Sequence, residues 1–160
     1  PSSVISIEAY SFTGCSSLTE IIIPSSMTSI NDSLFDGCSS LTKVVIPSSI
    51  TSIGDYAFNG CSSLAKLNIP HSVISIGNYA FNECISLTEI SLPSKLKKIG
   101  YSAFCHCIAL RHLSIPCSVT DLGNNILERC CSLEKIDFPS ELNIKLLGID
   151  GNINPIIVKI

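Results

Sequence analysis

The 160-residue sequence lacks any long hydrophobic run, although 46 % of its residues are hydrophobic. The apolar residues come in ones, twos and threes between serines and threonines. A membrane-spanning helix needs about 20 consecutive apolar residues, so we expect no membrane-spanning segment. The sequence does not begin with methionine, and we expect no signal peptide or stop-transfer segment within it.

An excess of charge of one sign is also missing. The net charge is −3, and the acidic and basic residues are scattered along the chain. Binding to nucleic acid or to a membrane surface usually requires a concentrated basic patch. The charge balance therefore predicts no nucleic-acid partner.

A 23-residue repeat dominates what is present. Seven of the eight prolines mark it: Pro1, Pro24, Pro47, Pro70, Pro93, Pro116 and Pro139. Counted from each proline, aliphatic residues occupy positions 4, 7, 21 and 23, an aromatic residue or leucine position 12, cysteine position 15 and leucine position 18. A fixed period of this length is typical of a solenoid. We expect one array of seven coils: 1–23, 24–46, 47–69, 70–92, 93–115, 116–138 and a degenerate 139–160. Because the sequence opens inside a repeat, it looks like a fragment of a longer array.

The third coil shows how each unit is expected to fold. Gly54 at position 8 suggests a turn with positive φ, and Asp55 after it can cap a single helical turn. Leu67 and Ile69 alternate with Asn68, which predicts a strand with one buried face. A coil cannot enclose its apolar residues alone, so the strands of successive coils should pair in parallel, each residue opposite its equivalent one repeat later.

Stacking would place identical side chains above one another. We expect a phenylalanine spine of Phe12, Phe35, Phe58, Phe81 and Phe104, continued by Leu127. The cysteines at position 15 follow the repeat period, so a ladder of buried, reduced thiols is favoured over a disulfide framework; these are Cys15, Cys38, Cys61, Cys84, Cys107 and Cys130. In the last coil, Ile153, Ile156 and Val158 are expected to restore the inward set of the strand.

The motif LxxIxIPxSVxxIGxxAFxxC closely resembles the BspA-like leucine-rich repeat, the 23-residue class also called the treponemal type. The resemblance covers roughly residues 1–144, with the clearest copies at 50–64 (ITSIGDYAFNGCSSL) and 73–87 (VISIGNYAFNECISL). It implies an α/β fold that is mostly β and irregular: a leucine-rich repeat solenoid with a parallel β-sheet on the concave side, and short turns or single helical turns elsewhere. Members are typically surface proteins of mucosal bacteria and parasitic protozoa, linked to adhesion. The motif residues serve the fold, so the resemblance transfers no catalytic or binding residue.

The outward positions of the strand, 20 and 22, form the candidate concave binding face: Glu20, Ile22, Lys43, Val45, Lys66, Asn68, Glu89, Ser91, His112, Ser114, Lys135 and Asp137. Opposite charges on neighbouring strands would support the sheet by about 0.2–1 kcal/mol per pair, which is the plainer interpretation of row 20. The functional interpretation is a contact surface with Ile22 and Val45 at its apolar end.

The fifth coil is the one strongly charged coil, with Lys95, Lys97, Lys98 and Arg111 and no acidic residue between Pro93 and Ile115. This candidate basic coil would bind an anionic glycan or a lipid headgroup, or would simply be a solvated surface. A lone glycosylation sequon, Asn31-Asp32-Ser33, has meaning only in a secreted chain.

The remaining chemistry-bearing residues suggest neither a metal site nor an active site. Cys105 and Cys107 are too close in sequence for the usual zinc spacing, and Cys107 and Cys130 belong to the core ladder. Cys105 and Cys117 lie off the ladder and are candidate accessible thiols. We find no convergent Ser, His and Asp positions, so we expect no enzyme, no catalytic residue and no cofactor.

The sequence therefore predicts a non-catalytic binding solenoid with a protein or glycan partner, part of a cell-surface or secreted adhesion or host-interaction protein. The alternative is an intracellular, cytoplasmic scaffold for protein–protein interaction.

Overall fold

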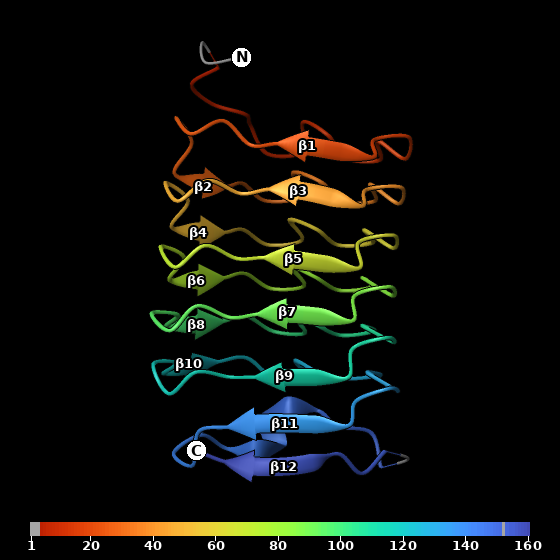
Figure 1. Ribbon diagram of the computed structural model, residues 1–160, viewed down its shortest axis with the longest axis vertical. Coiled ribbons are helices and arrows are strands. Elements are labelled where there is room, and N and C mark those ends of the chain that lie inside the picture. The colour runs from red at the N-terminus through yellow and green to blue at the C-terminus, as the bar shows by residue number, and fades with distance from the viewer. Residues whose placement is uncertain (1–3, 152) are drawn as a thin grey trace.

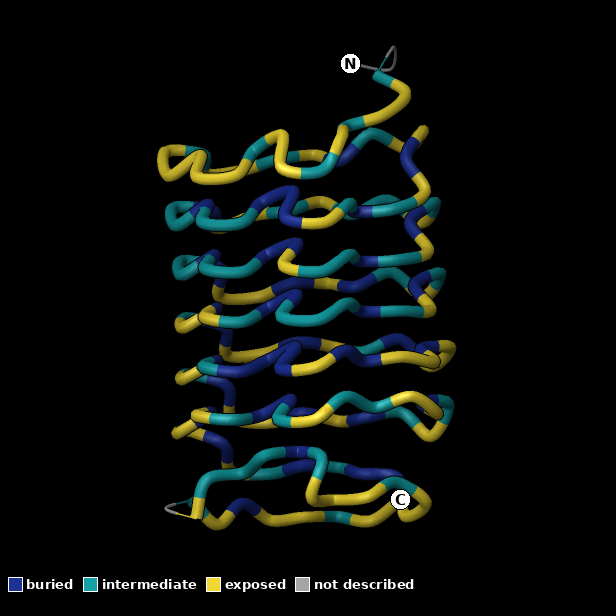
Figure 2. Tube along the Cα trace, turned by 180° about the vertical axis from the view of Figure 1, so that it is seen from behind, coloured by how far each residue is buried: buried dark blue, intermediate teal, exposed yellow. Residues whose placement is uncertain are grey.

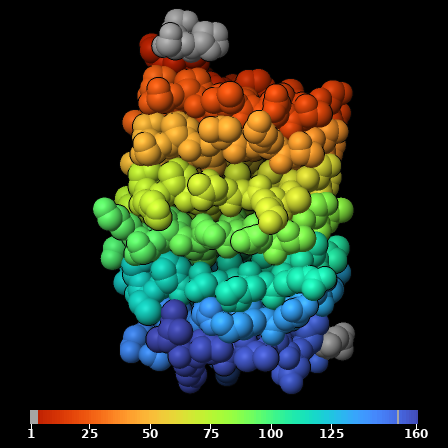
Figure 3. Space-filling view, viewed as in Figure 1, coloured from red at the N-terminus to blue at the C-terminus, as the bar shows by residue number. Residues whose placement is uncertain are grey.

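The computed structural model describes residues 4–151 and 153–160. The chain winds into a stack of coils, each of which forms one layer of the molecule (Figures 1 and 3). Parallel strands run along two opposite sides of the stack (Figure 1). No helix of the described residues is long and apolar enough to cross a membrane.

One side, which we call the long-strand face, carries the strands of positions 20–22: β1 (Glu20–Ile22), β3 (Lys43–Val45), β5 (Lys66–Asn68), β7 (Glu89–Ser91), β9 (His112–Ser114), β11 (Lys135–Phe138) and β12 (Ile156–Lys159). The pairing is parallel, and Leu67 lies opposite Ile90 as the repeat period predicts. Hydrogen-bonded pairing joins β1 to β3, β5 to β7, β9 to β11, and β11 to β12.

The other side, the short-strand face, is a second sheet that the sequence analysis did not predict. It consists of β2 (Ser29–Ile30), β4 (Ser52–Ile53), β6 (Ser75–Ile76), β8 (Lys98–Ile99) and β10 (Asp121–Leu122), in one continuous parallel ladder. Each strand is only two residues long, too short for alternation to reveal it in a sequence. The inward residue of each pair is the aliphatic side chain at position 7.

The core between the two faces is the predicted one. Neighbouring rings of Phe12, Phe35, Phe58, Phe81 and Phe104 stack with centroid distances of 5.3–5.7 Å and interplanar angles of 2–21°, and Leu127 is fully buried below them. The position-15 cysteines are free and buried, with the exception of Cys15. The expectation of burial is wrong for Cys15 because it lies in the first coil, which Figure 2 shows as mostly exposed.

The turns differ from the expectation at position 8. Gly54, Gly77 and the equivalent glycines do not have positive φ; the positive values fall at positions 10 and 14, for example Tyr56 (56°) and Gly60 (66°). In the third to sixth coils, position 8 is glycine where the coils approach closely: a Cβ on Gly77 would stand 2.6 Å from the backbone nitrogen of Asp55.

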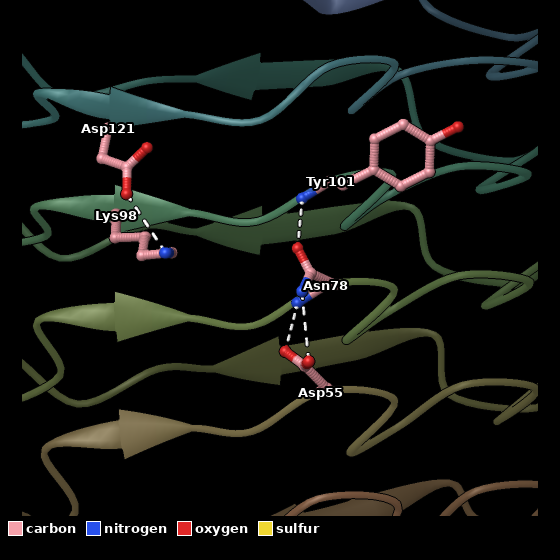
Figure 4. Close-up of polar contacts among 5 residues, drawn as sticks. All are labelled: Asp55, Asn78, Lys98, Tyr101 and Asp121. Atoms are coloured by element: carbon pink, nitrogen blue, oxygen red, sulfur yellow. Dashed lines mark hydrogen bonds and ion pairs between the residues drawn. The ribbon is translucent and has the colours of Figure 1, made fainter.

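Single helical turns also do not form in the middle coils. The described residues contain one short 3₁₀ helix, η1 (Ile144–Leu147). The side chain of Asp55 does not cap a helical turn of its own coil. It accepts hydrogen bonds from the backbone nitrogen of Asn78 at 2.7 Å and from its Nδ2 at 3.1 Å, and Asn78 in turn accepts from the backbone nitrogen of Tyr101 at 2.8 Å (Figure 4).

The last coil is shortened, so its strand β12 pairs with β11 in a changed register. Lys135 lies opposite Ile156, where an unbroken repeat would bring Val158. Ile157 lies opposite the buried Ile136, and Ile156 is 68 % exposed. The expected inward register of Ile156 and Val158 is therefore wrong by one residue. Ile153 does pack against the core.

Candidate functional site

The charged residues of row 20 form ion pairs between neighbouring strands. Lys43 Nζ lies 3.3 Å from Glu20 Oε2, and Lys66 Nζ lies 3.0 Å from Glu89 Oε2. The four side chains are 66–73 % exposed, and pairs at such exposure contribute little to stability, typically about 0–1 kcal/mol. These charged side chains therefore pair with one another across neighbouring strands, which is the arrangement expected if row 20 supports the sheet.

The far end of the face holds a more enclosed carboxylate. Asp137 accepts from Lys135 Nζ at 2.8 Å and contacts His112 Nε2 at 2.9 Å, and its side chain is only 16 % exposed. The hydrogen bond from Lys135, followed by that from His112, holds the pKa of Asp137 below its ordinary value. His112, Lys135 and Asp137 are therefore one cluster, in which the carboxylate is shared.

The apolar end of the face exposes the two predicted side chains. Ile22 is 75 % exposed and Val45 is 43 % exposed. They stand beside a hollow of about 410 Å³ lined by Ile22, Ile23, Pro24, Ser25, Ser26, Val45 and Pro47. On β5, β7 and β9 the same row carries Asn68, Ser91 and Ser114, so the apolar character is confined to the first two coils.

A second hollow, of about 530 Å³, lies between β7 and β9. Its lining residues are Thr88, Glu89, Ile90, Ser91, Leu92, Arg111, His112 and Ser114. Four of these belong to the candidate concave face, but no pattern in the sequence indicates that they gather around a depression. Thr88 and Arg111 at position 19 were not predicted as part of the face.

The basic coil is divided between the two sides of the molecule. Lys98 lies in β8 on the short-strand face, where its Nζ is 3.2 Å from Asp121 Oδ2 (Figure 4). Arg111 directly precedes β9 on the long-strand face and lies 3.3 Å from Glu134 Oε1. Each of the two has an acidic partner from the following coil. Lys98 and Arg111 therefore lie on opposite sides of the molecule, because a single coil wraps around the whole solenoid.

The two candidate accessible thiols have different positions. Cys117 is exposed, but Cys105 is buried, with 6 % exposure. Its Sγ contacts Nδ1 of His106 at 3.2 Å, and burial raises the pKa of the Cys105 thiol to about 11. The expectation of an accessible thiol is thus wrong for Cys105. Cys131, which the sequence analysis did not single out as accessible, is exposed.

The sequon asparagine already has partners inside the fold. Asn31 Nδ2, the atom that would carry a glycan, donates to the carbonyl oxygen of Ile7 at 2.7 Å, and its Oδ1 accepts from Ser29 Oγ at 2.9 Å. Ser33, the third residue of the sequon, is buried. A glycan on Asn31 would be attached to the same nitrogen that contacts the first coil.

Groups of three or more His, Cys, Asp or Glu that could hold a metal ion do not occur in residues 4–151 and 153–160. Cys105 and His106 are close together, but they do not gather further ligands of these types.

Repeating coils with a parallel sheet and a core of stacked, equivalent side chains define a leucine-rich repeat solenoid. The sequence matches the family described as BspA type leucine rich repeat region in six copies, at residues 1–77 and 58–146. The chain belongs to this family. A comparison with curated protein sequences found no match.

Solved structures with the same fold come from several bacteria. A leucine-rich repeat protein from Bacteroides ovatus is 37 % identical with a TM-score of 0.80, over 84 % of this chain and 35 % of that one. The T. pallidum leucine-rich repeat protein is 27 % identical with a TM-score of 0.74, over 95 % of this chain and 76 % of that one. The pneumococcal vaccine antigen PcpA shares the fold at 20 % identity and a TM-score of 0.50, over 75 % of this chain and 50 % of that one. The chain thus spans about a third of the Bacteroides protein.

Proposed function

We propose that this chain is a non-catalytic binding solenoid whose long-strand face receives a protein partner at the apolar end formed by Ile22 and Val45. Leucine-rich repeat arrays are protein-binding scaffolds, since the outward residues of their sheets are free to vary without cost to the core. The observation that carries the proposal is the exposure of Ile22 (75 %) beside a hollow rimmed by Pro24 and Pro47. Such a hollow suits an apolar anchor side chain from a partner.

The setting we propose is a cell-surface adhesion or host-interaction protein. Family membership supports this setting, because proteins with BspA-like repeats are typically surface proteins linked to adhesion. The intracellular scaffold is the second candidate, and it is favoured by one observation: all nine cysteines are free, an arrangement typical of reducing compartments. Antibody staining of intact against permeabilised source cells separates the two settings.

The partner surface is tested with two matched variants on the same row of the sheet. Val45→Asp places a charge at the apolar end, and Asn68→Asp places it on β5, away from the hollow. Both positions are exposed, so both variants should keep the wild-type circular dichroism spectrum. We expect Val45→Asp to lower the binding of labelled protein to epithelial cells at least tenfold and Asn68→Asp to leave it within twofold.

A different outcome would move the contact surface. If Val45→Asp binds as wild type while Lys97→Glu with Lys98→Glu abolishes binding, the partner contacts the short-strand face, where Lys98 lies in β8. If binding is unchanged both by Val45→Asp and by Lys97→Glu with Lys98→Glu, the long-strand face is not the partner surface and the proposal fails.

A further inference from the structure

The hydrogen-bond ladder of the long-strand face is interrupted at two junctions, between β3 and β5 and between β7 and β9. On either side of the second junction, the backbone nitrogen at position 19 donates to the position-19 carbonyl of the preceding coil: Thr88 to Ala65 at 3.0 Å, and Glu134 to Arg111 at 2.8 Å. Within the described part of the chain no such bond joins Arg111 to Thr88, and β7 and β9 belong to separate sheets. A backbone donor and a backbone acceptor are thus left at this junction.

The hollow of about 530 Å³ lies over the same junction. Ile90 and Leu92 supply its apolar part, and the hydroxyls of Ser91 and Ser114 stand on its two sides together with charged groups. Serine and glutamate are depleted from the cores of protein–protein interfaces, which favour aromatic side chains. A hollow with both polar and apolar lining is better suited to a small, hydroxyl-rich molecule that also carries apolar C–H faces.

The charges around the hollow compensate one another. Glu89 is paired with Lys66 at 3.0 Å, Arg111 with Glu134 at 3.3 Å, and Asp137 with Lys135 at 2.8 Å. The Nε2 atom of His112 is directed at the same Asp137 at 2.9 Å. Three cations thus face three anions, and the hollow offers hydrogen-bond donors and acceptors without a net field to attract an ion.

We propose that the hollow between β7 and β9 binds a neutral oligosaccharide. The hydroxyls of the sugar would exchange hydrogen bonds with Glu89, Ser91, Arg111 and Ser114, and one of its C–H faces would cover the apolar side chains. The volume exceeds that of a single sugar ring, so a short oligosaccharide fits better than a monosaccharide. This inference rests on the proposed function in placing a ligand on the same face, but it does not use the apolar end.

The test fills the hollow from one wall. Ser91→Tyr adds a ring inside the hollow, and Asn68→Tyr adds the same ring at the equivalent position of β5, outside it. The probe is a printed array of neutral, sialylated and sulfated glycans. We expect the wild type to retain neutral glycans, with binding that hardly changes between low and high salt because no ion pair with the ligand is screened. Ser91→Tyr should lose at least tenfold in retention, and Asn68→Tyr should stay within twofold.

Three results would overturn the proposal: retention of charged glycans alone, retention of no glycan, or equal retention by Ser91→Tyr and Asn68→Tyr. Ser114→Tyr fills the hollow from the opposite wall and repeats the test should Ser91→Tyr fail to fold. Val45→Asp separates this site from the partner site. If Val45→Asp loses cell binding and keeps neutral glycans, both sites stand. If glycan binding fails while Val45→Asp still abolishes cell binding, only the glycan site is wrong.

Discussion

The Cys61 thiol donates a hydrogen bond of 3.2 Å to the carbonyl oxygen of Phe35 in the preceding coil. The same contact recurs at 3.1–3.2 Å for Cys38, Cys84, Cys107 and Cys130, each with the phenylalanine of the coil before it. The ladder cysteines therefore satisfy backbone carbonyls inside the core. Their role is structural, and a cysteine at position 15 needs no catalytic or disulfide explanation.

This arrangement predicts which thiols react in the folded protein. Burial raises the pKa of Cys38 to about 11 and that of Cys84 to about 12, so both remain protonated at neutral pH. Iodoacetamide labelling followed by mass spectrometry should modify the exposed Cys15, Cys117 and Cys131 first. The five buried ladder thiols and Cys105 should react only in urea. Rapid native labelling of Cys61, or a disulfide between Cys61 and Cys84, would contradict the ladder.

The phenylalanine spine makes a graded prediction about stability. Phe58→Ala removes a fully buried ring that stacks on Phe35 and on Phe81, and the cost should be about 3–5 kcal/mol. Phe12→Ala is the control, since Phe12 is only partly buried and stacks on one ring, Phe35. Urea unfolding monitored by circular dichroism measures both. Equal losses of stability for the two variants would show that burial and stacking within the spine do not determine the cost of removing a ring.

Much of this fold could be predicted from the sequence because the repeat period decides which side chains stack. Leu67 lies opposite Ile90 for that reason alone. The period does not reveal what happens between coils. At position 13, Asn59 Nδ2 donates to Asp36 Oδ1 and Asn82 Nδ2 donates to Asn59 Oδ1, both at 2.7 Å. Cys105 holds the same position in its coil, and its thiol is buried although the sequence suggested an accessible one.

Only part of the candidate site could be predicted from the sequence, again because the repeat period does not reveal the contacts between coils. Alternation identified Ile22 and Val45 as outward, and both are exposed. The hollow lies between β7 and β9, where no backbone hydrogen bond joins Thr88 to Arg111 in the described part of the chain. No residue type marks such an interruption, since the side chains on either side follow the ordinary repeat.

The Asp137 carboxylate predicts a pH-dependent contribution to stability. Its hydrogen bonds with Lys135 and His112 hold its pKa in the folded chain below the ordinary 3.8. A lowered folded pKa adds stability above the unfolded value, and this stability is lost as the pH falls through the folded value. Asp137→Asn should therefore lower the urea midpoint at pH 7, and the difference from wild type should shrink below about pH 3.8. Glu141→Gln, at an exposed position, is the control; a difference that grows on acidification would contradict the assignment.

Gly77 tests whether position 8 is set by space or by backbone conformation. A Cβ there would stand 2.5 Å from Asp55 Oδ1 and 2.6 Å from the backbone of both Gly54 and Asp55. Backbone atoms cannot move aside without separating two coils, so Gly77→Ala should cost about 1–3 kcal/mol or more. Gly60 offers the opposite case: its φ is +66°, its nearest neighbours are 3.6 Å away, and the same position holds Glu83 at φ 58° in the next coil.

The matched variant is therefore Gly60→Asn, since asparagine tolerates the left-handed region better than most residues. We expect it to cost less than about 1 kcal/mol in urea unfolding. A larger loss for Gly60→Asn than for Gly77→Ala would contradict the assignment, because it would mean that the close approach of the coils at position 8 costs less than a side chain at an open left-handed position.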